Sequence, residues 1–113
     1  MMSLDVRTSS DVTILTPKGM LLGGKETDEL QSKIKELGEA GNRKLLVNLG
    51  QTTFLNSVSL GVLIAGHSSY AKRDAQMKLC AVDKKIQNIF VVTKLSLVFD
   101  VYDTEAQALA SFK

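Results

Sequence analysis

The sequence is poor in the residues that most often build covalent or metal-bound sites. It contains one cysteine, Cys80, one histidine, His67, and no tryptophan. A single cysteine excludes an intramolecular disulfide, and its apolar neighbours predict a buried thiol in a protein of a reducing compartment. A single histidine excludes a metal site built from several histidines. We expect His67 to be a partly covered structural residue of a helix.

Long apolar runs and a strong excess of one charge are also lacking. No segment approaches the roughly 20 apolar residues of a membrane-spanning helix, and the N-terminus has no signal-peptide core, so we expect a cytoplasmic protein outside the membrane. The net charge of +2 is too small to indicate nucleic-acid binding. Basic residues outnumber acidic residues in residues 41–98, and we expect most of them to form a solvated face. Of these, Lys84 and Lys85 are the two expected to meet an acidic partner.

The 113 residues are expected to form one domain, residues 1–113. Runs of β-branched residues, apolar residues at helical spacing and capping residues alternate along the chain. They predict strands at Leu4–Thr8, Val12–Thr16, Leu45–Leu49, Met77–Val82 and Leu97–Tyr102, and helices at Thr27–Leu37, from about Val58 to Arg73, after Asp83, and after Asp103 or Thr104. The last helix is expected to carry Ala106, Leu109 and Phe112. The order β-β-α-β-α-β-α-β-α indicates an α/β fold with a small mixed sheet and right-handed parallel crossovers.

A glycine-rich stretch from Gly19 to Lys25, predicted to be a loop up to Gly24, fits the first seven positions of a phosphate-binding P-loop. The eighth position is Glu26, where the motif needs Ser or Thr to hold magnesium, and a carboxylate there would repel phosphates. A nucleotide or other small-ligand sensor using this loop is therefore only a third hypothesis. The chain shows no pattern of catalytic side chains, so we expect no enzymatic activity, no cofactor and no bound metal.

The most informative stretch places Asn56 and Ser57 between an apolar strand-like run and an apolar helix. Asn and Ser are favoured as helix N-caps. The N–H groups and dipole at a helix N-terminus stabilise negative charge, so the fold would tolerate a phosphate on Ser57. Local physics alone favours a plain cap over a modification site. Gly61 and Gly66 each cost about 1 kcal/mol of helix propensity, which indicates close approach by the sheet or by a partner.

Residues 4–112 as a whole resemble the STAS family, the domain of anti-sigma factor antagonists. The resemblance rests on three segments: Val12-Thr13-Ile14-Leu15 running into Gly19, Leu46-Val47-Asn48-Leu49 followed by Phe54-Leu55-Asn56-Ser57-Val58-Ser59-Leu60-Gly61-Val62-Leu63, and Phe99-Asp100-Val101-Tyr102-Asp103-Thr104. The second is the most specific, because family members typically show F-[ILM]-D-S-S-G-L-G-V-L there. The resemblance implies a small sheet with helices packed mainly on one face.

The resemblance also implies a function. Ser57 falls on the serine that a partner kinase, itself the anti-sigma factor, phosphorylates in the bacterial family members. The unphosphorylated protein would bind this anti-sigma factor/serine protein kinase and free a sigma factor, and phosphorylation would end the contact. The partner would touch Asn56, Ser57, Val58, Ser59 and Gly61, and the protein would be a monomer or weak dimer.

Three positions next to Ser57 depart from the family pattern. Asn56 replaces an aspartate, Val58 replaces a second serine, and Ser59 replaces a glycine. Lys94 also stands where a glycine is frequent. These departures motivate a second hypothesis, a scaffold or regulatory STAS subunit that binds partners without a phosphorylation cycle.

Overall fold

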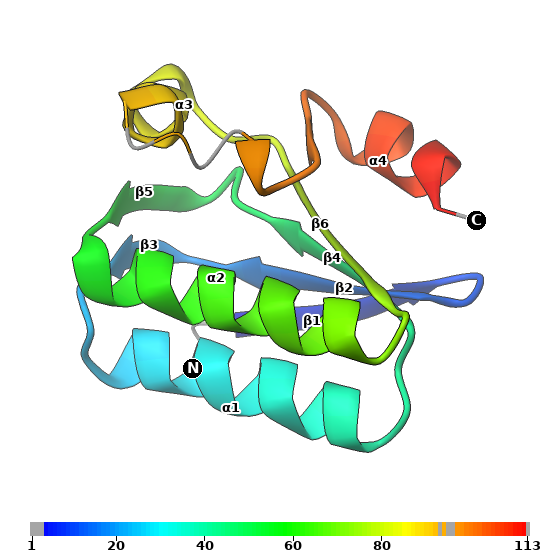
Figure 1. The fold of residues 1–113 in the computed structure, drawn as a ribbon. Coiled ribbons are helices and arrows are strands. Elements are labelled where there is room, and N and C mark those ends of the chain that lie inside the picture. The colour runs from blue at the N-terminus through cyan, green and yellow to red at the C-terminus, as the bar shows by residue number, and fades with distance from the viewer. Residues whose placement is uncertain (1–3, 93, 95–96, 113) are drawn as a thin grey trace.

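The structure is a computed structural model that describes residues 4–92, 94 and 97–112 (Figure 1). Its strands are β1 (Leu4–Ser9), β2 (Val12–Pro17), β3 (Gly19–Leu21), β4 (Lys44–Asn48), β5 (Thr52–Leu55), β6 (Gln76–Cys80) and β7 (Val101–Tyr102). Its helices are α1 (Lys25–Glu39), α2 (Ser57–Lys72), α3 (Lys84–Val92) and α4 (Glu105–Ser111). The predicted α/β alternation is confirmed, with β3 and β5 as additional short strands.

The main sheet has five strands in the order β1-β2-β4-β6-β7. β1 pairs antiparallel with β2 through a tight turn in which Ser10 has a φ of 52°. The other strands are parallel, with Ile14 opposite Leu46 and Leu46 opposite Lys78. The chain reaches β4 through α1 and β6 through α2, so the sheet is mixed, as the element order predicts.

Neighbouring residues of the central strands point to opposite faces of the main sheet. Val47 and Leu79 belong to the larger core cluster, together with residues of α1, α2 and α3. Leu46 and Cys80 point to the other face, where Ala108 of α4 packs against them. α1 and α2 lie side by side over one face of the sheet, well apart from α4 (Figure 1). The helices therefore pack mainly on one face.

Lys78 is the exception among the basic residues predicted to be solvated, because only 5% of it is exposed, on the α4 side of the sheet. Its Nζ donates hydrogen bonds to the carbonyl oxygen of Ser111 at 3.1 Å and to the Ser111 hydroxyl at 2.9 Å. It also lies 5.0 Å from the centre of the Phe112 ring. A cation is stabilised at a helix C-terminus, so this buried charge fixes the end of α4.

A second, two-stranded sheet pairs β3 in parallel with β5, with Met20 opposite Phe54 and Leu21 opposite Leu55. The prediction of a loop from Gly19 to Gly24 is therefore wrong for its first three residues. A three-residue strand has no periodic pattern of its own and exists only through its partner strand. Because α1 follows β3 and α2 follows β5, this small sheet brings the N-termini of both helices to one end of the molecule (Figure 1).

One strand prediction in the C-terminal part needs correction. The strand expected at Leu97–Tyr102 is limited to β7, because Phe99 is buried instead against the rings of His67 and Phe90, at centroid distances of 5.3 and 5.8 Å. Lys94, at the frequent glycine position, has a φ of 63°, which a glycine would adopt at lower cost.

In α4 the cap is Thr104, and Ala108 is buried. Thr104 is one of the two predicted caps, and its hydroxyl accepts the Gln107 N–H at 3.1 Å. Asp83 caps α3 as predicted, since its Oδ1 accepts the Ile86 N–H at 2.9 Å.

Candidate functional site

Ser57 is the first residue of α2 and is exposed. The N-cap is Asn56, whose Oδ1 accepts the N–H groups of Val58 and Ser59, both at 3.1 Å. The Ser57 hydroxyl takes no part in this cap and forms no hydrogen bond within the described part of the chain. It is therefore free to react or to meet a partner.

Ser59 completes the cap from inside the molecule. Its hydroxyl accepts the backbone N–H of Asn56 at 2.9 Å and donates to the Asn56 carbonyl oxygen at 3.0 Å. These bonds form a capping box, in which N-cap and third helical residue satisfy each other's backbone groups. Because Ser59 is fully buried, it positions the site and offers no surface to a partner.

Asn56 and Val58 also attach the start of α2 to the loop between β3 and α1. The Asn56 side-chain amide donates to the carbonyl oxygen of Leu22 at 2.9 Å. A Cβ placed on Gly23 would lie 3.1 Å from Val58 Cγ1, so the Val58 side chain fits against a residue without one. The three departures next to Ser57, at Asn56, Val58 and Ser59, therefore all make contacts at this helix start.

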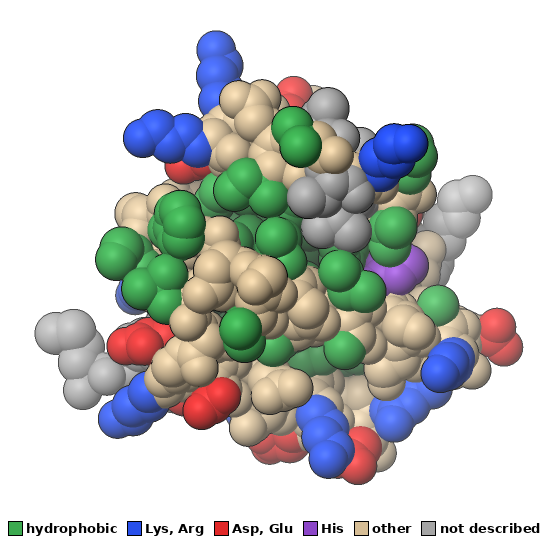
Figure 2. Space-filling view, turned by 60° about the vertical axis from the view of Figure 1, so that its left-hand side comes forward, with side chains coloured by type: hydrophobic (Ala, Val, Ile, Leu, Met, Phe, Trp, Pro, Cys, Tyr) green, Lys and Arg blue, Asp and Glu red, His purple; other side chains and the backbone are tan. Residues whose placement is uncertain are grey.

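An apolar rim surrounds the start of α2. It consists of Met20, Leu22, Phe54 and Val58, which are 53%, 47%, 46% and 54% exposed. Met20 and Phe54 are strand partners, while Leu22 and Val58 lie on the two sides of the Asn56 cap. Figure 2 shows hydrophobic side chains gathered on this face of the molecule. Exposed apolar patches of this kind mark interaction sites.

This apolar rim was not predicted from the sequence. The loop predicted from Gly19 to Gly24 did not indicate which side chains face outward, and of Met20, Leu21 and Leu22 only Leu21 is buried. The available signal was the presence of large apolar residues in a segment with no helix or strand period. Only the β3–β5 pairing determines which of them face outward.

The two glycines of α2 have different surroundings. A Cβ on Gly66 would lie 3.0 Å from Ile34 Cγ2 and 3.1 Å from Met77 Sδ, so Gly66 allows α2 to approach α1 and the sheet. A Cβ on Gly61 would meet nothing within 4 Å, and Gly61 is exposed. Internal packing therefore accounts for Gly66 and leaves Gly61 open to a partner.

The stretch that fits the P-loop motif does not form a phosphate cradle. Gly19–Leu21 is strand β3, and the N–H of Gly23 donates to the hydroxyl of Thr27 at 2.9 Å. Lys25 already opens α1. The first turn of α1 carries Glu26 and Asp28, whose carboxylates would repel a phosphate at this helix start.

The single histidine and cysteine are structural. His67 is half-buried with its ring edge-on to Phe99, as expected for a covered helix residue. Cys80 is fully buried, and burial raises the pKa of its thiol to about 12, so it is no nucleophile at neutral pH. Within residues 4–92, 94 and 97–112, no group of three or more His, Cys, Asp or Glu side chains is placed to hold a metal ion.

None of the described helices has the length and apolar character needed to cross a bilayer. The basic residues predicted to form a face are spread over several elements. Lys44 is paired with Asp11, and Arg43 donates to the carbonyl oxygen of Asp74. Lys84 and Lys85 are exposed at the start of α3, as predicted.

A model of the STAS domain family matches residues 3–108. The inferred anti-sigma factor antagonist BtrV of Bordetella bronchiseptica is 18% identical over 93 residues, which are 82% of this chain and 80% of that protein. The crystal structure of an inferred anti-sigma factor antagonist from Thermotoga maritima superposes with a TM-score of 0.88 at 22% identity, covering 95% of this chain and 92% of that one. The phosphorylated form of the Bacillus cell fate determinant SpoIIAA superposes with a TM-score of 0.76 at 14% identity, covering 95% and 96%. The family match and the shared fold lead to one conclusion: the chain belongs to the STAS domain family.

Proposed function

We propose that the protein is an anti-sigma factor antagonist. It binds an anti-sigma factor that is also a serine kinase, releases a sigma factor by doing so, and loses this contact when Ser57 is phosphorylated. The observation that carries the proposal is the exposed, unbonded Ser57 hydroxyl within the apolar rim. Relatives of similar fold described as anti-sigma factor antagonists support it.

The partner surface in this proposal is the start of α2 with the apolar rim. Ser57, Val58 and Gly61 contact the partner directly, while Asn56 and Ser59 hold them in place. The protein acts in the cytoplasm, by binding and not by catalysis, as a monomer or weak dimer. Lys84 and Lys85 extend the surface toward acidic groups of the partner.

The position of Ser57 supports the proposal that a phosphate acts as a switch. A phosphate adds about −1.5 to −2 charges at neutral pH. Because Asn56 already occupies the N–H groups of Val58 and Ser59, the phosphate stays on the outer surface. The first turn of α2 has no acidic residue to repel it, so the fold is kept. Retaining the partner would require burying this charge among apolar side chains, which is unfavourable.

Phosphomimetic and blocked variants test the proposal against the cognate kinase. We expect Ser57→Asp to abolish binding and Ser57→Ala to bind constitutively, both with wild-type circular dichroism. Ser68→Asp places the same charge at an exposed position further along α2 and should bind like the wild type. Tight kinase binding by Ser57→Asp would contradict the mechanism.

A second candidate function is a scaffold STAS subunit without a phosphorylation cycle. The observation that favours it is the side chain of Asn56, which caps α2 and binds Leu22 without adding a charge beside the Ser57 hydroxyl. Mass spectrometry of the protein purified from its own cells separates the two. Phosphate on Ser57 excludes the scaffold, and its absence under all growth conditions excludes the switch.

A further inference from the structure

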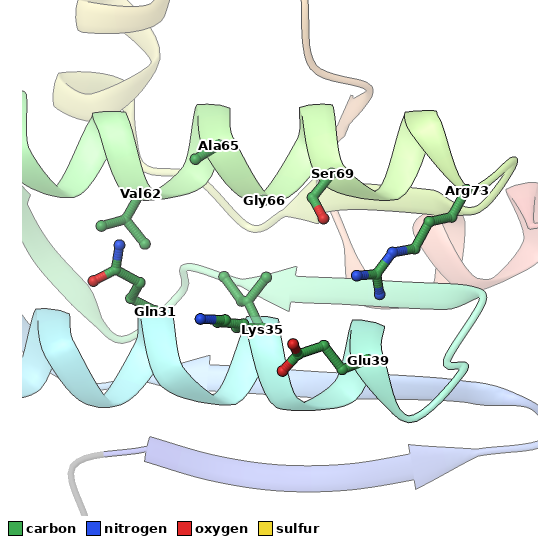
Figure 3. A pocket seen from close by; sticks show the side chains of 9 residues that line it. Gln31, Lys35, Glu39, Val62, Ala65, Gly66, Ser69 and Arg73 are labelled. Carbon is green, nitrogen blue, oxygen red and sulfur yellow. The ribbon is translucent and has the colours of Figure 1, made fainter.

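A cavity lies between α1 and α2, away from Ser57 (Figure 3). Its volume is about 280 Å³, and Ile34, Val62 and Gly66 contribute to its apolar wall. Arg73, at the C-cap of α2, lies at the other end of the helix from Ser57, about 24 Å along its axis at 1.5 Å per residue. The lining of the cavity includes none of the rim residues, although Val62 lies one helical turn after Val58 of the rim.

Gly38 of α1 has no side chain, and this leaves space for Arg73 to reach across the cavity. A Cβ on Gly38 would lie 2.8 Å from Arg73 Nη1, so the guanidinium occupies the space that Gly38 leaves. Figure 3 shows the guanidinium pointing into the groove between the helices. Within the described residues it forms no ion pair and donates no hydrogen bond. Its planar set of donors is therefore available to a ligand.

The other charges of the cavity also favour an anion. Lys35 is a second cation, and Glu39 is the one carboxylate among the lining residues. Neither side chain forms an ion pair within the described part of the chain. Two cations against one carboxylate leave a positive balance beside an apolar wall.

We propose that this cavity binds a small organic carboxylate with an apolar body. The carboxylate would pair with the guanidinium of Arg73, which matches it in a bidentate geometry. The apolar body would lie against Ile34 and Val62. Compared with the enclosed cavity of about 150 Å³ that holds benzene, the volume of this cavity matches a ligand of about ten to twelve non-hydrogen atoms. Part of this ligand would stay in contact with solvent, because Lys35, Glu39 and Arg73 are exposed. The site does not depend on the proposed function of Ser57.

Titration with 3-phenylpropionate, followed by the backbone amide signals of the ¹⁵N-labelled protein, tests this site. We expect saturable shifts at Gly66, Ser69 and Arg73 at millimolar concentrations or below. 3-Phenylpropanamide keeps the apolar body but has no charge, and inorganic phosphate has the charge but no apolar body. Each should bind at least about tenfold more weakly. Equal binding of either would overturn the proposed class of ligand.

Charge variants sharpen the test, because they should act in opposite directions. Arg73→Gln should weaken 3-phenylpropionate binding by about 10- to 100-fold, while Glu39→Gln should strengthen it. Lys72→Gln removes a charge next to Arg73 but outside the cavity lining, and should bind like the wild type. Unlocalised shifts, or equal affinities in all variants, would overturn the proposal. If the same amide signals move with protein concentration when no ligand is present, the groove binds a second copy of the chain. That result would also overturn the proposal.

Discussion

At the scale of single residues, Asn56 connects three parts of the site through its side chain and its backbone. Its Oδ1 caps α2, its side-chain N–H group binds the Leu22 carbonyl, and its backbone bonds to Ser59. An aspartate could form the cap but could not donate to Leu22. Asparagine therefore places no negative charge next to Ser57, and it binds the loop that contains Leu22.

Replacing Asn56 should therefore lower stability. We expect Asn56→Ala to reduce the free energy of unfolding by about 0.5–2 kcal/mol through loss of the cap. Asn56→Asp should cost less, because the cap remains and the helix dipole favours its charge. Urea denaturation followed by circular dichroism measures both. Ser57→Ala, at an exposed hydroxyl outside the cap, is the control and should stay within about 0.5 kcal/mol of the wild type. An unchanged Asn56→Ala variant would contradict this account.

The two glycines of α2 offer a matched pair of substitutions. Gly61→Ala should raise the free energy of unfolding by about 0.5–1 kcal/mol, because the helix gains alanine propensity and the new methyl group meets open space. Gly66→Ala should lower it by about 1–3 kcal/mol, since its methyl group would press on Ile34 and Met77. Thermal denaturation distinguishes the signs. Stabilisation by both substitutions would show that α2 does not pack as described.

If the partner docks on this surface, Gly61→Ala should also bind the kinase more weakly although it folds more stably. A variant that gains stability and keeps full affinity would remove Gly61 from the contact. The affinity measurement uses the same kinase as the Ser57 variants, so the two results can be compared directly.

Residue preferences made part of the site predictable. The identities of Asn56 and Ser57 mark a helix start wherever they occur before an apolar helix, because capping is a local interaction. The burial of Ser59 depends on which side of α2 faces the core, and Val58 is exposed for the same reason. The apolar rim required the β3–β5 pairing, which short segments do not reveal.

At the scale of elements, α4 is held at its first turn by a charged group and at its end by Lys78. The carboxylate of Glu105 accepts hydrogen bonds from the Arg7 guanidinium of β1 and, at 3.0 Å, from the Asn48 side chain of β4. The hydrogen bond from Arg7 is the main cause that lowers the pKa of Glu105, with a smaller contribution from Asn48. These bonds join α4 to two strands of the main sheet.

This contact should give α4 a pH-dependent contribution to stability. Because the pKa of Glu105 is lowered in the folded state, its contribution is present above the unfolded glutamate pKa of about 4.3 and is lost as pH falls through the folded value. We expect Arg7→Gln to be less stable than the wild type at pH 7, and the difference to shrink below about pH 4. Urea denaturation across this range measures the difference.

Arg43→Gln is a suitable control, because Arg43 binds the carbonyl oxygen of Asp74, which does not titrate. Its difference from the wild type should stay nearly constant over the same pH range. A constant difference for Arg7→Gln as well would show that Glu105 does not contribute in this way.

Elements with a regular pattern were predicted well from the sequence, and elements created by pairing were not. The apolar run of β4 and the capped apolar helix α2 carry their own signals, so they were located to within about one residue. β3 and the shortened β7 depend on their neighbours, β5 and β6. The burial of Phe99 in place of a longer β7 is a tertiary choice that no local pattern contains.

At the scale of the whole molecule, the start of α2 and the small sheet present one apolar surface at one end (Figure 2). Because the side chains of the rim are about half exposed, their loss should affect binding more than folding. Phe54→Gln and Met20→Gln should each weaken kinase binding by about tenfold or more. Each should lower the free energy of unfolding by only about 1 kcal/mol, because about half of each side chain is buried.

Val6→Gln is the matched control, because Val6 is 40% exposed on the edge strand β1, away from the rim. It should leave kinase binding unchanged. Equal losses from Val6→Gln and Phe54→Gln would indicate general surface stickiness instead of a docking surface.

The most direct test of the central claim compares one kinase with two forms of this protein. The affinity of the cognate anti-sigma factor kinase is measured by calorimetry for the unmodified protein and for the same protein carrying phosphate on Ser57, with the site verified by mass spectrometry. We expect tight binding of the unmodified form and a loss of about 100-fold or more on phosphorylation, because a charge would enter an apolar contact. Equal affinity of the two forms would contradict this claim.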